Sequence, residues 1–495
     1  MEPRGQGETS DDVIGGGVTS DKGARDSAPI DDQQVPWATL AVSSLAVFAV
    51  FLDTSVLFVA FPSITASFPD VAPAELSWIL NGYTIVFAAL LIPAGRMADR
   101  RGHKRTFLTG SILFTVSSLA CAVAPTAGFL VAARLVQGIG AAVLLPSSMA
   151  LVLRGTPHAK LPFALAVWGA TGAVAGALGP TLGAALVEAG GWRWVFLINI
   201  PVGVFTVLVG RRVLSESADP QSTVPAPLGV ILLIAASAAV SFGLVRGEEW
   251  GWSDGRTLGP VAIGLAILVV FVLHQRRTLA PTIDPALFAI RNFAWANAAT
   301  IVFAVAFTSM FLSSILFLTT IWGWSILAAG LGVAPGPLLV AFLAPFMGRL
   351  AGQIGQRPLL LVGGLLYATS GLWRLMMLGP ESNYVVEYLP SMLFSGLGVA
   401  LCLPQLSSVV GQSLPPNRHG VGSAVNQAFR QFGGTFGVAL TIGLLADTSG
   451  IVDAAGRFDR VWWVILLGGL AVSLLALPLR TRPAHRVAPA AAATG

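Results

Sequence analysis

Charged residues are scarce in this chain of 495 residues, since only 11% are Asp, Glu, Lys or Arg while 55% are hydrophobic. Soluble globular domains carry about 25% charged residues, so the composition excludes an ordinary soluble protein. Cysteine is also nearly absent, and both residues, Cys121 and Cys402, lie inside apolar stretches. Two such cysteines exclude a disulfide framework and a cysteine-based metal site.

Motifs of enzymes and of ATP-driven pumps are absent as well. The sequence has no HExxH pair, no Walker-type phosphate loop and no recognisable nucleophile–base pair. The five histidines lie between or beyond the apolar runs, which excludes a histidine proton relay inside a membrane: His103, His158, His274, His419 and His485. We therefore expect no enzyme activity, no cofactor, no metal and no nucleic-acid partner.

Long apolar runs are what the sequence has instead. Each is about 20 residues long, enough to cross roughly 30 Å of hydrocarbon as a helix, and the runs are continuous rather than alternating as in a membrane barrel. The sequence thus predicts an all-α integral membrane protein with about fourteen transmembrane helices. The predicted spans are residues 37–61, 76–94, 106–124, 127–151, 163–188, 194–213, 227–245, 258–273, 293–320, 326–347, 358–378, 388–410, 421–446 and 461–479. A count of twelve stays open, because the separations at Pro125, 322–325 and 418–420 are short.

The distribution of basic residues supports the count of fourteen. If both termini and every second loop are cytoplasmic, most of the 29 Lys and Arg residues face the cytoplasm, as the positive-inside rule requires. Losing one span would break this alternation. We expect a multi-pass protein of the cell membrane with both termini in the cytoplasm.

An internal repeat divides the chain. The segment GRMADRRGHKR at 95–105 is echoed by GRLAGQIGQRP at 348–358, eight predicted spans later. Repeats of this kind are typical of transporters. Two six-span halves would place the echo six spans later, so two extra spans lie between the halves. The expected organisation is a disordered cytoplasmic tail (1–35), an N-terminal six-helix half (36–213), two inserted helices (214–278), a C-terminal six-helix half (279–480) and a cytoplasmic tail (481–495).

Five segments in this order carry a resemblance: LSWILNGYTIVFAALLIPAG, GRMADRRGHKR, RLVQGIGAAVLLPSS, GALGPTLGAAL and GWRWVFLINIPVG. Over about residues 37–480, the chain resembles the fourteen-span drug:proton antiporters of the EmrB/QacA type, within the major facilitator superfamily. The resemblance implies a monomer that exports small hydrophobic or cationic compounds, such as drugs and antibiotics, in exchange for protons by alternating access. Two alternatives remain: a dedicated exporter or flippase for one metabolite or lipid, and a receptor or structural protein that kept the fold.

Ionisable residues deep inside predicted spans are few, and such residues are costly to bury and usually functional. Asp53 is the one acid well inside a span, and Arg134 and Arg430 are the interior cations. Asp53 and Arg134 lie at matched depths, with Gln137 one turn from Arg134. We expect Asp53 to carry the coupling proton; the alternative is a purely structural ion pair with Arg134. Candidates for the substrate cavity and for coupling are Asn81, Tyr83, Arg134, Gln137 and Arg430.

The segment at 95–105 has a candidate function beyond anchoring. Asp99 lies near the C-terminal end of its helix, where a carboxylate opposes the helix dipole, so it should serve another partner. In the family that the chain resembles, this loop latches the two halves on the cytoplasmic side. The latch residues would be Gly95, Asp99, Arg100, Gly102 and Arg105. Topological anchoring by the basic residues alone is the alternative.

Glycines of the fifth predicted span repeat at intervals of three and four residues and so share one helix face. A glycine face allows two helix backbones to touch. The predicted packing motif comprises Gly176, Gly179, Pro180 and Gly183, together with Gly169 and Gly172. The family resemblance associates this motif with export, while tight packing without directional meaning is the alternative. The segment GWRWVFLINIP is assigned no chemistry.

Overall fold

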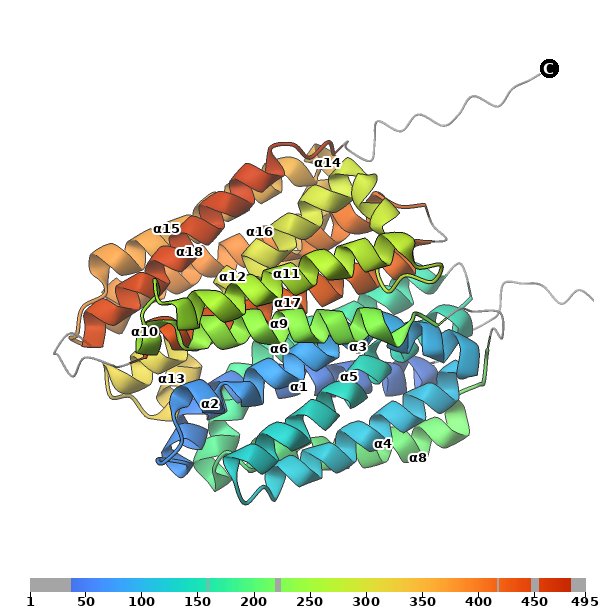
Figure 1. Ribbon diagram of the computed structural model, residues 1–495, viewed down its shortest axis with the longest axis horizontal. Coiled ribbons are helices and arrows are strands. Elements are labelled where there is room, and N and C mark those ends of the chain that lie inside the picture. The colour runs from blue at the N-terminus through green and yellow to red at the C-terminus, as the bar shows by residue number, and fades with distance from the viewer. Residues whose placement is uncertain (1–36, 158–159, 219–223, 416–417, 447–453, 482–495) are drawn as a thin grey trace, which may run out of the picture. The chain divides into compact units, whose positions relative to one another are not determined.

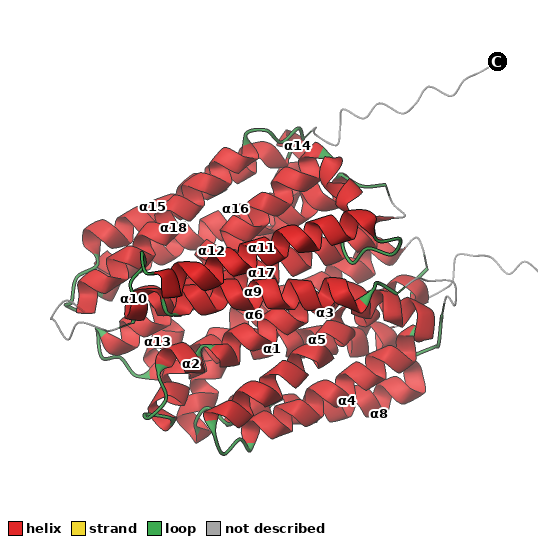
Figure 2. Cartoon of the chain, viewed as in Figure 1, coloured by secondary structure: helices red, strands yellow, loops and turns green. Residues whose placement is uncertain are grey.

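The computed structural model describes residues 37–157, 160–218, 224–415, 418–446 and 454–481. Helices fill almost all of these residues, and no strand occurs among them (Figure 2). The predicted tail at 1–35 lies outside the described residues, as does the C-terminal tail apart from Thr481. The described structure therefore consists of the helical part of the chain.

Every predicted span corresponds to a helical segment. The first group is α1 (Trp37–Ser67), α2 (Pro73–Leu76), α3 (Trp78–Arg101), α4 (His103–Ala122), α5 (Ala127–Gly155), α6 (Leu161–Gly190), α7 (Trp194–Leu197) and α8 (Asn199–Val213). The inserted pair is α9 (Pro227–Val245) and α11 (Gly255–Arg277), joined through α10 (Gly247–Trp250). The last group is η3 (Pro285–Ala289), α12 (Arg291–Thr320), α13 (Ile326–Val333), α14 (Pro335–Ile354), α15 (Gln356–Met377), η4 (Tyr384–Tyr388), α16 (Leu389–Gln412), α17 (His419–Leu445) and α18 (Ala454–Ala476).

Thirteen helices of the described chain are long and apolar enough to cross a membrane. The predicted span that is missing from these thirteen is α17, a helix of 27 residues. Polar residues at 426, 427, 430 and 431 lower its hydropathy. The short separations that left twelve spans open are real helix ends, since α4 stops at Ala122 before α5 and α12 stops at Thr320 before α13. The expectation of an all-α membrane protein with about fourteen helices is confirmed.

Many helix contacts fall within a first and a last group of helices. In the first group α1 packs on α6, α3 on α5, and α4 on both α5 and α8; in the last group α15 packs on α16 and α18, and α12 on α17. The groups meet where α3 packs on α17, α1 on α12 and α6 on α13. Helix α9 packs on α3 and on α17, and in Figure 1 the green α9 and α11 lie between the blue and the orange-red helices.

The glycine face of α6 packs against α1 at specific positions. A Cβ added to Gly179 would lie within 2.5 Å of the Cβ of Ser55, and one added to Gly183 within 3.0 Å of the Val56 backbone. A Cβ on Gly176 would meet nothing within 4 Å, so Gly176 does not share the close contact expected of it. At 100° per residue, Gly176 lies at the edge of the face that Gly179 and Gly183 centre on. The packing motif is therefore narrower than its spacing indicates.

Another side of α6 contacts the last group of helices. A Cβ on Gly330 of α13 would lie 2.8 Å from the carbonyl oxygen of Pro180 and 2.5 Å from the Cβ of Ala184. The turn that contains Pro180 therefore touches α1 through Gly179 and α13 through its own backbone. This turn is one of the places where the two halves are in direct contact.

Candidate functional site

The most deeply buried charges of the first half form one ion pair. Asp53 lies at the middle of α1 and Arg134 near the start of α5, and each side chain is only 1% exposed. The Asp53 Oδ2 atom lies 2.6 Å from Arg134 Nη1. Thr126 caps α5 by accepting a hydrogen bond from the Phe129 amide, which fixes the helix start two turns before Arg134. The two charges, which the sequence predicts at equal depths in the membrane, are therefore in direct contact.

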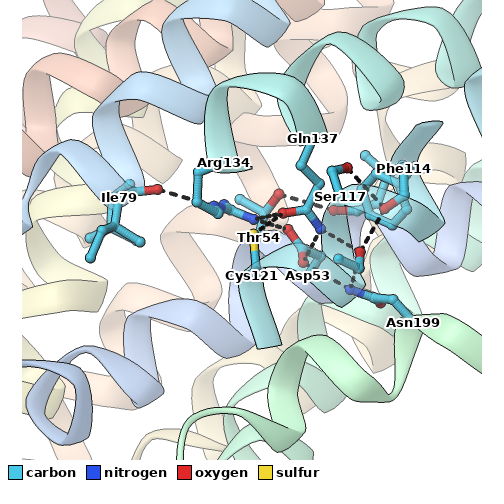
Figure 3. A network of polar contacts seen from close by, with 12 residues as sticks. Asp53, Thr54, Ile79, Phe114, Ser117, Cys121, Arg134, Gln137 and Asn199 are labelled. Atoms are coloured by element: carbon cyan, nitrogen blue, oxygen red, sulfur yellow. Dashed lines mark hydrogen bonds and ion pairs between the residues drawn. The ribbon is translucent and has the colours of Figure 1, made fainter. Parts of the chain in front are cut away.

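The second carboxylate oxygen of Asp53 is bound by two amides. Gln137 Nε2 and Asn199 Nδ2 each donate to Asp53 Oδ1 at 2.9 Å. Gln137 Nε2 also donates to Ser118 Oγ at 2.7 Å (Figure 3). The carboxylate thus accepts from side chains of α5 and α8, with α4 supporting them. Three side-chain donors therefore converge on one buried carboxylate.

Arg134 is held from several sides as well. Its Nε donates to the carbonyl oxygen of Ile79 at 3.1 Å, and its Nη1 donates to Gln137 Oε1 at 2.6 Å. Its guanidinium carbon lies 3.9 Å from the ring centre of Tyr83, in a cation–π contact. Burying an unpaired arginine in a membrane helix costs at least ~2 kcal/mol, so these contacts offset a real penalty. We call Asp53, Arg134, Gln137, Asn199 and Ser118 the Asp53 cluster.

The predicted site residues divide into those inside the cluster and those outside it. Asp53, Arg134 and Gln137 are in it, and Tyr83 joins through its ring. Asn81 is fully buried in α3, and neither of its amide atoms has a hydrogen-bond partner in the described structure. The geometry therefore does not bring Asn81 to the carboxylate.

Sequence reasoning missed two members of the cluster. Asn199 belongs to the segment GWRWVFLINIP, which was assigned no chemistry, and Ser118 was not singled out. The available signal for Asn199 was a lone amide in an apolar run. Serine at 118 carried less information, because Ser and Thr are common in membrane helices and often bond to their own backbone.

Arg430 lies apart from the cluster, in the second half. It is partly exposed, its Nη2 donates to Gln427 Oε1, and its guanidinium carbon is 5.6 Å from the ring centre of Phe51 on α1. A further arginine that the sequence did not single out, Arg374 of α15, is completely buried. Its Nε donates to Ser391 Oγ at 3.1 Å, while Nη1 and Nη2 have no hydrogen-bond partner in the described chain.

Two of the predicted latch residues, Gly95 and Asp99, contact helices of their own half. Asp99 Oδ1 lies 3.4 Å from His103 Nε2 and 3.9 Å from Arg154 Nη2, and a Cβ on Gly95 would meet Pro146 of α5. Arg100 is exposed. A latch that joins the two halves stays a prediction, because these contacts all lie within the first half.

The backbone conformation and the close packing at position 102 explain why glycine occurs there. Its φ of 103° is a left-handed value that favours glycine, and a Cβ there would lie 2.4 Å from Glu216 Oε1. The Glu216 carboxylate accepts from the Lys104 and Arg105 amides at 3.1 Å each, and so caps the N-terminus of α4. Arg105 adds a weak ion pair, with its Nε 3.8 Å from Glu216. The segment that follows α8 is thereby tied to the turn between α3 and α4.

Comparison with known proteins agrees with this architecture. The multidrug resistance protein Stp of Mycobacterium tuberculosis is 34% identical over 412 residues, which cover 82% of this chain and 75% of that protein. The cephamycin export protein CmcT of Amycolatopsis lactamdurans is 32% identical over 470 residues, or 92% of this chain and 95% of that one. These similarities confirm the resemblance that the sequence motifs indicate.

The fold has a solved counterpart. The crystal structure of a D-xylose–proton symporter matches with a TM-score of 0.63 at 15% identity, covering 90% of this chain and 98% of the other. A likeness at this identity concerns the fold alone. The model of the Major Facilitator Superfamily matches residues 43–438 and 296–494. The chain is a multi-pass membrane protein that belongs to the major facilitator superfamily.

Proposed function

We propose that this protein exports small hydrophobic compounds from the cell in exchange for protons, with Asp53 as the proton carrier. The observation that carries the proposal is the Asp53 cluster, in which the one acid deep inside the described helices is held by three side-chain donors. The printed functions of the relatives, multidrug resistance and cephamycin export, support a drug or antibiotic as the substrate.

Protonation of Asp53 would change the contacts of three helices at once. A neutral carboxyl no longer balances Arg134, and the oxygen that takes the proton becomes a donor that faces other donors, Arg134 at Oδ2 or Gln137 and Asn199 at Oδ1. The cluster must then rearrange, because an unpaired buried arginine is costly. Since Asp53, Arg134 and Asn199 lie on α1, α5 and α8, this rearrangement links the proton to movement between helices.

The transport cycle follows from this link. Asp53 is charged and bound by Arg134 when the site faces the cytoplasm. As the site turns outward the pair loosens, a proton neutralises Asp53 and the substrate leaves. The proton is released when the site faces inward again. In this proposal residues 36–213 and 279–480 move against each other, and residues 214–278 are an insertion.

Several further properties belong to the proposal. The protein acts in the cell membrane as a monomer with both termini in the cytoplasm. It is a transporter and not an enzyme, and its partners are the exported compound, protons and lipid.

Transport by purified protein in lipid vesicles tests the proposal. Vesicles with an imposed pH difference should accumulate several chemically unrelated hydrophobic dyes, and collapse of the pH difference with a protonophore should stop accumulation. Accumulation that ignores the pH difference would refute proton coupling. Uptake of one compound and no other from a broad panel would favour a dedicated exporter over a multidrug transporter.

A further inference from the structure

We propose that the exported hydrophobic compounds carry a negative charge, and that Arg430 is the specificity-determining residue that recognises it. The inference rests on the proposed export function and goes beyond it by naming the charge of the substrate. It also departs from the cationic substrates that the sequence resemblance implies.

The charges available inside the bundle point to this sign. Among Asp, Glu, Lys and Arg of the described helices, those more than six residues from both ends of their helix are Asp53, Arg134 and Arg430. Asp53 is 1% exposed, and both its oxygens already accept hydrogen bonds. A cationic compound would find no free carboxylate there.

Arg430 is the charge that remains without a counter-ion. No carboxylate lies within 4 Å of it in the described part of the chain, and the one hydrogen bond found for it goes to a neutral amide, that of Gln427. Unlike Arg134, which is 1% exposed, Arg430 is partly exposed although it lies near the middle of α17. The side chain is therefore partly open, and a ligand that reaches it would meet a charge without a counter-ion.

The side chain of Arg430 reaches the boundary between the two halves. On α17, a Cβ at Gly433 or Gly437 would touch the backbone of α12, while Thr435 Oγ1 donates to Thr84 Oγ1 of α3 at 2.7 Å. At 100° per residue, Arg430 lies about 20° from Gly437 and about 140° from Thr435, so it is at the edge of the face that packs on α12. Its guanidinium carbon, 5.6 Å from the Phe51 ring centre, confirms that it meets α1 of the other half.

Aromatic rings also occur where α1 meets α12 and suit a hydrophobic ligand body. Phe58 of α1 packs on Phe311 of α12 with ring centres 5.6 Å apart, and Phe311 packs on Phe307 at 6.1 Å. Phe51 and Phe58 are partly exposed although they lie inside a membrane helix. The Phe51 ring beside the guanidinium, with these further rings on the same two helices, matches a hydrophobic compound with one anionic group.

The positive charge of Arg430 favours an anionic ligand over a cationic one. An anion next to Arg430 gains charge-assisted hydrogen bonds from a guanidinium that has unused donors. A cation of the same size meets repulsion from Arg430. The buried Arg374, whose two terminal nitrogens have no hydrogen-bond partner in the described chain, adds potential of the same sign in the second half.

Two isosteric hydrophobic ions provide the test. The full-length protein, purified in detergent, is dialysed to equilibrium against tetraphenylborate or tetraphenylphosphonium in detergent-matched buffer, so that only saturable binding to protein is counted. We expect tetraphenylborate, which has no hydrogen-bond acceptor, to bind about tenfold more tightly through charge attraction alone. Arg430→Gln should remove this preference and Arg430→Lys should keep most of it. Arg349→Gln, which removes an exposed arginine of α14, is the matched control and should leave the preference unchanged.

Each other outcome counts against the inference. Equal binding of the two ions by the unchanged protein, or tighter binding of tetraphenylphosphonium, would overturn it without any variant. An undiminished anion preference in folded Arg430→Gln would also overturn it, since another group would then read the charge. The test is independent of proton coupling. If the unchanged protein shows no preference for the anion but transports dye when a pH difference is imposed, only this inference is refuted. If the unchanged protein prefers the anion but shows no pH-driven transport, the proposed function is refuted.

Discussion

Asp53 on α1 and Arg134 on α5 form a 2.6 Å ion pair inside the membrane bundle, although 81 residues separate them in the sequence. Gln137 and Asn199 complete the coordination of the carboxylate from two further directions. Such a cluster is neutral as a whole when Asp53 is ionised and positively charged when Asp53 is protonated.

Asn199 should be needed for efficient proton-coupled transport. Asn199→Ala removes one of the three side-chain donors that hold the Asp53 carboxylate. A hydrogen bond to a charged group contributes about 1.5 kcal/mol or more, which corresponds to about a tenfold change in rate. We expect the initial rate of pH-driven dye accumulation in vesicles to fall about tenfold.

Thr206 is the matched control for Asn199. It lies on the same helix, is buried, and its hydroxyl has no hydrogen-bond partner in the described structure. Thr206→Val should leave the rate of pH-driven accumulation unchanged. An equal fall in both variants would show that the packing of the helix, and not the hydrogen bond to Asp53, sets the rate.

Asp99 should be needed for transport rather than for insertion. Asp99→Asn removes the charge that faces His103 and Arg154 at the turn between α3 and α4. We expect normal membrane abundance and a transport rate reduced about tenfold or more, as a weakened latch implies. Asp284→Asn is the matched control, because Asp284 is also paired with an arginine, at 3.7 Å, and asparagine can still cap its helix. Undiminished transport in Asp99→Asn would favour simple anchoring.

The glycine face of α6 predicts opposite effects for two neighbouring positions. Gly179→Ala forces a methyl group onto Ser55 and should lower the free energy of unfolding by about 1–3 kcal/mol. Gly176→Ala meets open space and should be neutral or stabilising, since alanine favours a helix by about 1 kcal/mol over glycine. Thermal unfolding of the two purified variants checks this. Equal loss of stability at both positions would contradict the structure.

Much of the fold could be predicted from the sequence, because long apolar runs and basic loops have few physical solutions. Every predicted span is a helix, even α17, whose polar residues give it a weak hydropathy signal. The pairing of Asp53 with Arg134 could be predicted as well, because two buried opposite charges at equal depth lower each other's cost.

Other parts of the site depend on how helices turn toward one another, which periodicity alone does not give. Asn199 points at Asp53 because α8 packs on α1 and α4, and the sequence of its own segment does not predict this packing. Gly176 makes no close contact for the same reason, because it lies a few tens of degrees around α6 from the centre of the face that touches α1. Gly102 has a left-handed φ, and the side chain that a Cβ there would clash with, that of Glu216, lies more than a hundred residues away in the sequence.

Topology is tested by labelling. Single cysteines placed at Ser27 and at Ser253, in a background without Cys121 and Cys402, should react with a membrane-impermeant reagent from opposite sides. Ser27 lies outside the described residues, and Ser253 lies between α10 and α11. The two positions are separated by seven predicted spans, so labelling from the same side would contradict a cytoplasmic N-terminus followed by these seven spans.

The most direct test of the account is efflux by Asp53→Asn in vesicles with an imposed pH difference. Glu188→Gln, which neutralises an exposed acid at the end of α6, serves as the control and should transport normally. If Asp53→Asn does not fold, Asp53→Asn with Arg134→Met removes both charges and keeps the question open to measurement. We predict that the Asp53 variant still binds dye but does not accumulate it against its gradient. Accumulation at the rate of the unchanged protein would show that Asp53 does not carry the proton and that its pair with Arg134 is structural.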